Sequence, residues 1–481
     1  MPAYKLIAAL AVGCITVAFA SEVEQRIQHV TSNLTAPIVI KGSHNAHSLA
    51  ERMKELHVMG VSIAVIHEEK IEWARGFGVR AVNGPPVTPE TLFQAASISK
   101  PLSAMAALRL VEQHKLGLDT DINAYLTSWK LPSAAVTAGK PITLRGLITH
   151  TAGINVHGFP GYASSAPVPT LVQVLNGEKP ANTEAIRSEA APGERWQYSG
   201  GGFTIMQQAL IDLSKEPYPK LLHDSVLAPI GMTRSTYEQP LPTALRENAA
   251  TPYIADGKAI EGGAHTYPEM AAAGLWTTPS DLARYAIEVQ QSLHGKANHV
   301  LSTDMTRQML TAGMGHWGLG IAVQGDKKDN LYFTHGGANE GFRCQLVAYE
   351  NSGDGAVIMT NSDAGSGLAD EIIHSIAIEY GWPDFQPVER TSMAVDPKIL
   401  GHYVGTYEIA KGFNLVVTLE QGQLMTQATG QEKVPIYAES ETKFFPTVMP
   451  AEIEFVKDDH GSVTRLILHQ GGRERKAPKK F

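Results

Sequence analysis

Residues 94–102 read QAASISKPL, and Ser97 to Lys100 within them form a Ser-x-x-Lys pattern. A pattern with two fixed positions is expected about once by chance in a chain of this length, and a second copy, SETK, runs from Ser440 to Lys443. Pro101 distinguishes the first copy, because proline lacks an N–H and is tolerated only in the first turn of a helix. We therefore predict a helix that begins near Ser97.

This position gives the Ser97 hydroxyl the surroundings that a nucleophile needs. The start of a helix offers backbone N–H groups without an intrahelical partner and the positive end of the helix dipole. Lys100 follows one turn later on the same face, and a desolvated lysine can act as the base for a serine that attacks a carbonyl. In the second copy Lys443 precedes Phe444 and Phe445 in a strand-rich stretch, and its side chain is expected to face water. We predict that Ser97 and Lys100 are the catalytic pair.

The segments around this helix predict an α+β fold. Residues 61–66 and 71–78 read as a β-hairpin joined by the polar turn HEEK, and residues 104–115 read as a buried helix that Gly117 ends. Four strand-like segments lie between residues 318 and 361, and a helix is expected from Ala369 to Tyr380. Strands at both ends with helices between them predict one antiparallel sheet, closed by distant segments and flanked by helices.

The last part of the chain has a different pattern. The stretch GWPDFQPVERTSMAVDP contains three prolines and predicts a linker, which we assign to residues 383–396. Residues 397–481 contain short alternating strands joined by turns such as EQG and DDHG, without a helix-length run, which is typical of a small antiparallel β-barrel. The predicted organisation is a first domain over residues 21–382, the linker, and the barrel.

The N-terminus carries an export signal. Lys5 is followed by the apolar run LIAALAVGCITVAFA, which ends in the small-x-small pattern Ala18-Phe19-Ala20, so residues 1–20 read as a signal peptide cleaved after Ala20. A membrane anchor needs about 20 apolar residues, more than this run supplies. Lipid attachment at Cys14 is the other alternative, but the apolar run continues past the cysteine. We expect a periplasmic or secreted protein with no stable membrane span after cleavage.

The composition is that of a globular protein, with 43% hydrophobic and 18% charged residues among 481. A formal net charge of −8 argues against a nucleic-acid binder, which would normally show a basic face. The chain has two cysteines, and cleavage would leave only Cys344, so an internal disulfide is not expected. It has no HExxH motif and no tight His/Asp/Glu cluster, so we predict neither a metal site nor a cofactor.

The stretch around Ser97 resembles the serine β-lactamase and penicillin-binding-protein superfamily, whose Ser-x-x-Lys motif lies at such a helix start. The closer resemblance is to the class C-like serine hydrolases of the CubicO group, over about residues 48–380. The stretches that carry it are LITHTAGI (147–154), PGERWQYSGGGF (192–203), PIGMTRS (229–235), AAGLWTTPSDLARY (272–285) and HGGANEGF (335–342). From about residue 400, YVGTYEI looks like the lipocalin-like domain often appended to such hydrolases. The resemblance implies a β-lactamase/transpeptidase-like first domain.

The resemblance also implies a catalytic tyrosine. Tyr198-Ser199-Gly200 stands where the family has Tyr-x-Asn, and Tyr198 would share proton transfer with Lys100; a structural tyrosine is the alternative. The literal match YEN at 349–351 lies at a predicted strand end and reads as a turn. Gly200 in place of asparagine removes an amide that contacts substrate in relatives, so the substrate stays open.

The third family motif is Lys-Thr-Gly in most relatives and His-x-Gly in some, and here HGG at 335–337 fits it. Another match, HWG at 316–318, opens a strand, and its histidine reads as a surface or packing residue. By resemblance, the substrate-binding residues are His335, Gly336 and Gly337, and the oxyanion N–H groups belong to Ser97 and Ala338. The glycines would let a substrate lie along the strand edge as an added strand.

Together these features predict an exported serine hydrolase that cleaves an amide or ester through an acyl-enzyme on Ser97. The substrate would be a peptide, including peptides with D-residues, or a small ester. Neutral His335 in place of a lysine favours uncharged substrates over carboxylate-bearing ones. Two alternatives stay open: a class C-like β-lactamase, and a non-catalytic penicillin-receptor-like binding protein. A class A β-lactamase is disfavoured, because no Ser-Asp-Asn motif follows the nucleophile.

Overall fold

The computed structural model describes residues 21–43, 46–325, 330–431, 433–471 and 473–480, which form two compact units. One unit is Ala50–Ala369, and the other joins the described residues up to Leu49 with those from Asp370 onward. The predicted signal peptide, residues 1–20, lies outside the described part. Among the described residues, no helix has both the length and the apolar character needed to cross a membrane.

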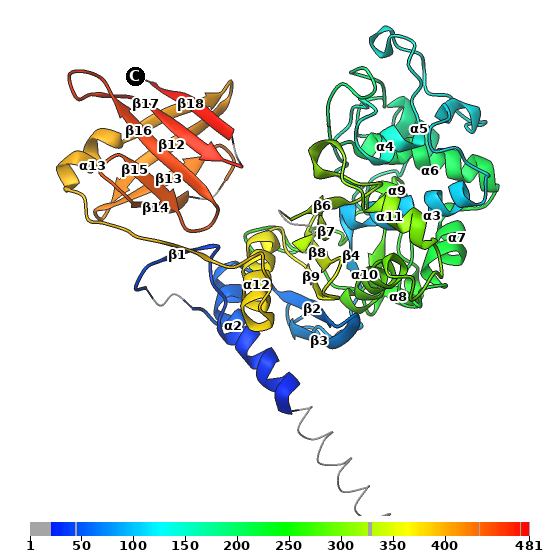
Figure 1. The fold of residues 1–481 in the computed structure, drawn as a ribbon, viewed down its shortest axis with the longest axis horizontal. Coiled ribbons are helices and arrows are strands. Elements are labelled where there is room, and N and C mark those ends of the chain that lie inside the picture. Colours follow the sequence, from blue (N-terminus) through cyan, green and yellow to red (C-terminus); the bar gives the residue numbers. More distant parts are fainter. Residues whose placement is uncertain (1–20, 44–45, 326–329, 432, 472, 481) are drawn as a thin grey trace, which may run out of the picture. The chain divides into compact units, whose positions relative to one another are not determined.

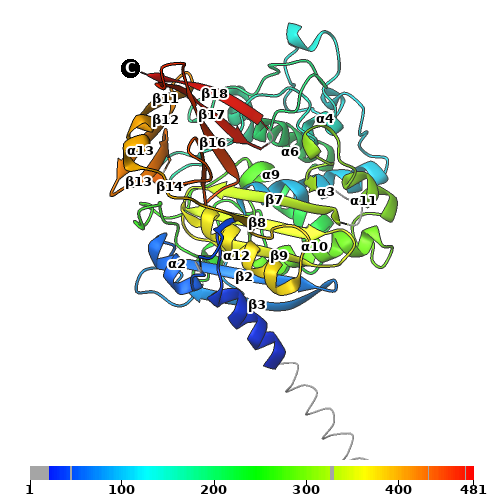
Figure 2. The same ribbon diagram turned by 60° about the vertical axis from the view of Figure 1, so that its left-hand side comes forward.

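An antiparallel sheet of six described strands forms the centre of the first unit, in the order β3-β2-β9-β8-β7-β6 (Figure 1). The strands are β2 (Gly60–His67), β3 (Lys70–Gly78), β6 (Ala322–Gln324), β7 (Tyr332–Asn339), β8 (Phe342–Tyr349) and β9 (Gly355–Thr360). Strand β2 lies beside β9, with Val61 opposite Thr360, and Figure 2 shows these strands side by side. The predicted sheet closed by distant segments is therefore confirmed.

Helices cover this sheet and build the region between its two halves. They are α2 (Leu49–Glu55), α3 (Ser99–Glu112), α4 (Leu144–Ile148), α5 (Leu171–Asn176), α6 (Gly200–Ser214), α7 (Tyr218–Leu222), α8 (Thr243–Arg246), α9 (Met270–Ala273), α10 (Pro279–Leu293) and α11 (Thr303–Met309). Helix α10 packs across β2, β3, β8 and β9, while α3, α6 and α9 contact one another. Buried alanines and glycines on these three helices allow the close approach.

The predicted hairpin and the predicted helix after Ser97 are both present, but the helix ends earlier than expected. The hairpin turns at Glu68 and Glu69, which both have positive φ angles, 51° and 58°, as a tight two-residue hairpin turn requires. Helix α3 was expected to continue to residue 115, just before Gly117, but it ends at Glu112. The prediction of its end is wrong because His114 takes a left-handed conformation, φ 56°, which no helix can continue.

The second unit contains the predicted barrel, closed by eight of the described strands (Figure 1). They are β11 (Gly405–Ala410), β12 (Phe413–Glu420), β13 (Gln423–Ala428), β14 (Lys433–Ala438), β15 (Lys443–Pro446), β16 (Ala451–Lys457), β17 (Val463–Gln470) and β18 (Arg473–Lys480). Tyr403 of helix α13 (Pro397–Tyr403) stacks on Phe455 with the ring centroids 4.3 Å apart. Side chains of the alternating strands thus fill the interior, as an eight-stranded barrel allows.

The other segments of this unit are also ordered. Residues 21–32 are helical, and Ser375 of helix α12 (Gly365–Tyr380) donates to Val30 O at 2.8 Å. Strand β1 (Ile38–Ile40) pairs in parallel with β10 (Val388–Arg390). The proline-rich stretch assigned as a linker therefore contains a short strand.

Candidate active site

Ser97 lies in a sharp turn that leads directly into α3. The turn is the 3₁₀ segment η1 (Ala96–Ile98), and Ala96 has a φ of 49°, which is unusual for a residue with a Cβ. Ser99 holds this turn: its hydroxyl donates to Ala96 O at 2.6 Å and accepts from Leu275 N at 3.0 Å. The Ser97 side chain is thus presented at the entry of a helix, close to where the sequence predicted it.

Lys100 is buried directly beside Ser97. Its Nζ donates to Ser97 Oγ at 3.0 Å and to Ala272 O at 2.8 Å, with only 2% of the residue exposed. The carbonyl belongs to α9, which Gln207 of α6 holds in place: its Oε1 accepts from Ala271 N at 2.9 Å. A fixed carbonyl therefore orients the amine toward the Ser97 hydroxyl.

Tyr198 lies just before α6, with the centre of its ring 5.0 Å from Lys100 Nζ. The next residue, Ser199, caps the helix by accepting from Gly202 N at 3.0 Å. At Gly200, where the motif that this stretch resembles has an asparagine, a Cβ would lie 2.9 Å from the Phe159 ring. The departure from the family motif therefore has a steric reason, because a side chain at this position would displace Phe159.

Strand β7 brings the third motif to the same place. Because side chains alternate along a strand, His335, Gly337 and Asn339 share one buried face, while Gly336 and Ala338 are exposed. Asn339 Nδ2 donates to Gln94 Oε1 at 2.8 Å, which ties the strand to the segment that carries Ser97. A Cβ at Gly337 would lie 2.3 Å from Ala95 O, so only glycine permits this approach.

The outer edge of β7 is open beyond Thr334. Strand β6 pairs with residues 332–334 only, and among the described residues no other strand covers the edge that continues to Asn339. An extended peptide could add to such an edge as a further strand. The edge runs along the residues that the sequence assigned to substrate binding.

His335 is a neutral side chain. Its Nδ1 lies 2.6 Å from Gly336 O, and since a carbonyl can only accept, Nδ1 carries the proton. Burial, with a smaller contribution from Lys100, lowers the pKa of His335 to about 3. The Nε2 atom is buried and has no hydrogen-bond partner among the described residues. The ring centre lies 6.3 Å from that of Tyr198, so the structure brings Ser97, Lys100, Tyr198 and His335 together.

Two tryptophans and two histidines surround Tyr198 and were not assigned to the site from the sequence: Trp196, Trp317, His150 and His157. Trp317 is buried. Four other rings pack around it, with ring centres 4.8–5.8 Å from the centre of the Trp317 ring: those of His150, Trp196, Tyr198 and His335. In the sequence, only the HWG match at 316–318 and the family-like stretches at 147–154 and 192–203 could have pointed to these residues as part of the site. As expected, the His316 side chain itself faces solvent.

The second Ser-x-x-Lys copy has no such surroundings. Ser440 Oγ accepts from Lys443 N at 3.0 Å, which closes a turn before β15. Lys443 Nζ forms an ion pair with Glu452 Oε1 at 3.0 Å, so it points to a carboxylate at the surface of the barrel and not to the serine. This geometry is that of a surface turn.

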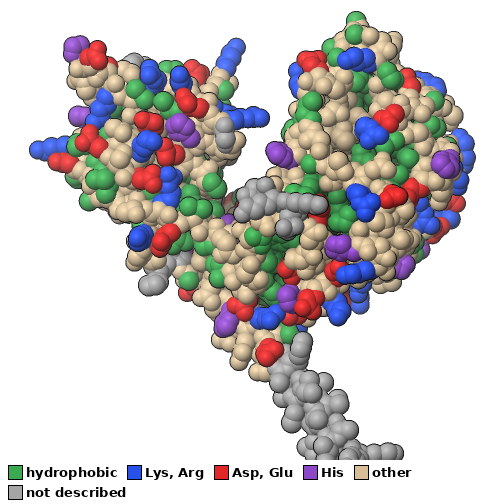
Figure 3. All heavy atoms as spheres, viewed as in Figure 1, with side chains coloured by type: hydrophobic (Ala, Val, Ile, Leu, Met, Phe, Trp, Pro, Cys, Tyr) green, Lys and Arg blue, Asp and Glu red, His purple; other side chains and the backbone are tan. Residues whose placement is uncertain are grey.

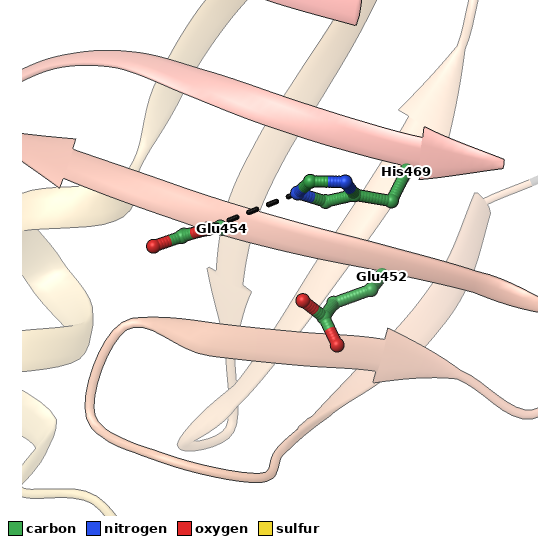
Figure 4. A group of neighbouring side chains, drawn as sticks. All are labelled: Glu452, Glu454 and His469. Carbon is green, nitrogen blue, oxygen red and sulfur yellow. Dashed lines mark ion pairs between the residues drawn. The ribbon is translucent and has the colours of Figure 1, made fainter. Parts of the chain in front are cut away.

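One group of possible metal ligands occurs among the described residues, on the barrel (Figure 4). Glu452, Glu454 and His469 lie on neighbouring strands with ligand atoms within 4.8 Å of one another. However, Glu452 already pairs with Arg390 at 3.0 Å and with Lys443. These cations supply the positive charge that a metal ion would bring, so the residues form an ion-pair cluster.

Figure 3 shows how the charged side chains are distributed on one face of each unit. Positive and negative side chains alternate over the visible face of each unit, and no basic stripe gathers among the described residues in that view. This distribution agrees with the net charge of −8.

Comparisons with known proteins agree with this architecture. A family model described as Beta-lactamase matches residues 46–379, and a model for a domain of unknown function, DUF3471, matches residues 389–477. Penicillin-binding protein 4* of Bacillus subtilis (strain 168) is 22% identical over 456 residues, which cover 89% of this chain and 97% of that protein.

Two solved structures share the fold. The octameric penicillin-binding protein homologue from Pyrococcus abyssi has a TM-score of 0.61 at 22% identity, over 89% of this chain and 98% of that one. The D-amino acid amidase from Ochrobactrum anthropi SV3, complexed with L-phenylalanine amide, has a TM-score of 0.53 at 19% identity, over 69% of this chain and 96% of that one. At these identities the likeness establishes the fold alone.

Proposed function

Because the chain belongs to the beta-lactamase family, we propose that it is a serine hydrolase that forms an acyl-enzyme on Ser97. The observation that carries the proposal is the buried Lys100 amine, which lies between Ser97 Oγ and Ala272 O at 3.0 and 2.8 Å. A serine next to an oriented, desolvated amine is the arrangement that nucleophilic catalysis requires.

In the proposed reaction, Lys100, acting with Tyr198, takes the proton of the Ser97 hydroxyl. Ser97 Oγ then bonds to the carbonyl carbon, and the carbonyl oxygen becomes an anion that accepts from the N–H groups of Ser97 and Ala338. The C–N or C–O bond to the leaving group breaks as that group receives the proton. In the second half, the same groups take a proton from water, whose oxygen bonds to the acyl carbon. The bond to Ser97 Oγ then breaks as Ser97 receives the proton.

The proposed substrate is an uncharged amide or ester, with peptides that contain D-residues as the first class to examine. His335 is neutral and cannot supply the fixed positive charge that a lysine offers to a carboxylate. The open edge of β7 supports an extended substrate. The D-amino acid amidase that shares the fold supports the choice of an amide as the first probe.

We also propose that the hydrolase domain spans residues 21–382 and that a linker over 383–396 leads to the barrel over 397–481. The mature protein is proposed to begin at Ser21 and to be periplasmic or secreted. N-terminal sequencing of native material tests this assignment: a lipid-modified Cys14 or an intact N-terminus would contradict it.

The experiment for the hydrolase proposal combines labelling with a substrate screen. A fluorophosphonate probe should add its mass to the peptide that contains Ser97, and Ser97→Ala should abolish both labelling and turnover of p-nitrophenyl acetate. Ser440→Ala is the matched control and should behave as the wild type. D-aminoacyl amides, short esters and a chromogenic cephalosporin are then compared. Labelling without any turnover would favour a receptor, and a cephalosporin rate above the best ester rate would favour a β-lactamase.

A further inference from the structure

His150 binds the main chain on both sides of Tyr198. It follows α4 and is buried, with 2% of the residue exposed. Its carbonyl oxygen accepts from Gln197 N at 2.8 Å, and its Nδ1 accepts from Ser199 N at 3.1 Å. The residues immediately before and after Tyr198 are therefore both hydrogen-bonded to this one histidine.

The His150 ring also packs against the Tyr198 ring. The two ring centres are 4.3 Å apart with planes tilted by 35°. The backbone of His150 has a φ of 60°, a left-handed conformation that directs the carbonyl and the side chain of one residue to Gln197 and Ser199. Three contacts from His150 thus determine where the Tyr198 phenol lies relative to Lys100.

We propose that His150 is a positioning residue, which fixes the Tyr198 ring beside Lys100 by holding the main chain on either side of it. This inference rests on the proposed function, in which Tyr198 shares proton transfer with Lys100. A proton-transfer group displaced by about 1 Å can lose about 100-fold in rate. Holding both neighbours of Tyr198 prevents such a displacement.

The arrangement requires an unprotonated Nδ1, because a protonated ring would point an N–H at the Ser199 N–H. The charged and titratable groups that face His150 are Lys100, His335, His157 and Tyr198. Burial lowers the pKa of His150 well below its ordinary value, with a smaller contribution from Lys100. Burial therefore favours the unprotonated ring that the bond to Ser199 needs.

Two substitutions distinguish the effect of the hydrogen bond that His150 Nδ1 accepts from the effect of the packing of its ring. His150→Phe keeps an aromatic ring against Tyr198 but removes the acceptor for Ser199 N–H. His150→Asn removes the ring but places an oxygen where Nδ1 lies, and asparagine tolerates a positive φ. His157→Phe is the matched control. The His157 ring also lies close to Tyr198, with ring centres 4.9 Å apart. However, the hydrogen bond that His157 accepts from Gly200 N goes to its main-chain carbonyl, which the substitution keeps.

Steady-state kinetics on the best ester or amide, below the lowest Tm of the set, give the readout. We expect His150→Phe to lower kcat by about 100-fold with little change in KM, and His150→Asn to recover most of that rate. In a Tyr198→Phe background, His150→Phe should cost little more, because the two residues act as one unit. His157→Phe should keep the wild-type kcat.

Three outcomes would overturn the proposal: a wild-type kcat in His150→Phe, an equal loss in the Tyr198→Phe background, or a His150→Asn variant as slow as His150→Phe. A thermal melt of each variant shows whether the fold is retained. Failure of the proposed function is distinguishable, since the wild type would then turn over no ester or amide at all.

Discussion

Gly337→Ala should separate the position of β7 from the chemistry of the side chains around it. The added methyl group would lie 2.3 Å from Ala95 O and 3.3 Å from Ala96 Cβ, whereas ordinary contact begins at 3.4 Å. Either β7 or the turn that carries Ser97 must therefore move by about 1 Å. The neighbouring atom belongs to the main chain, so no side-chain rotation can relieve the overlap.

The expected effect has two parts. Overpacking of this kind costs about 1–3 kcal/mol of stability, which should lower Tm by several degrees. A displacement of about 1 Å between Ser97 and the Ala338 N–H should lower kcat/KM by about 100-fold. Ester turnover and a thermal melt on the same preparation measure both effects.

Gly336→Ala is the control for stability. A methyl group there meets only the end of the Gln345 side chain, 3.1 Å away, and the position is exposed. Its Tm should therefore stay close to that of the wild type. If Gly337→Ala lowered Tm but kept the wild-type kcat/KM, the distance between β7 and Ser97 would not govern catalysis, and the proposed oxyanion contact with Ala338 would be wrong.

Four further substitutions test the electrostatics and the proton transfer. Lys100→Ala and Tyr198→Phe should each lower kcat by orders of magnitude, and the double variant should lose little more; penalties that multiply in steady-state kinetics would contradict a shared role. Burial raises the pKa of Glu269 from 4.5 to about 8. Between these pH values the carboxyl group ionises in the unfolded chain but stays protonated in the folded protein, so the stability of the folded protein falls as the pH rises. Glu269→Gln should therefore raise Tm more at pH 8 than at pH 5, and equal shifts in the two melts would refute this. His335→Lys should raise kcat/KM for carboxylate-bearing esters relative to uncharged ones, because His335 is neutral above its pKa of about 3; an unchanged ratio would show that residue 335 does not face the acyl group.

The features that the sequence predicted well depend on short-range rules. The spacing of Ser97 and Lys100 together with Pro101 specifies a helix start, and the structure has it within two residues. Strand alternation indicated the barrel, and the polar turn at 67–70 indicated the hairpin between β2 and β3. In each case the determining residues are neighbours in the chain, so pattern and structure coincide.

The features that were missed arise from contacts between distant segments. Nothing in the HWG stretch shows that Trp317 will pack against Tyr198, because loops separated by more than a hundred residues must meet first. His150 lies in the family-like stretch at 147–154, but its two bonds around Tyr198 depend on the fold of both loops. The left-handed His114 is a local choice that the sequence pattern does not signal. Packing, and not periodicity, decides these positions.

The pairing of β2 with β9, which lie far apart in the chain, determines when the central sheet can form. Strand β2 is complete early in synthesis, but its second partner ends at Thr360, so a ribosome must translate nearly the whole first unit before the central sheet can close. Pairings this distant are slow to form, because the loop-closure entropy must be overcome before the contacts stabilise the chain. During that interval the apolar β2 has an edge that can pair with other chains. The β2 edge that faces β9 therefore stays unpaired until the last strand of its sheet has been made.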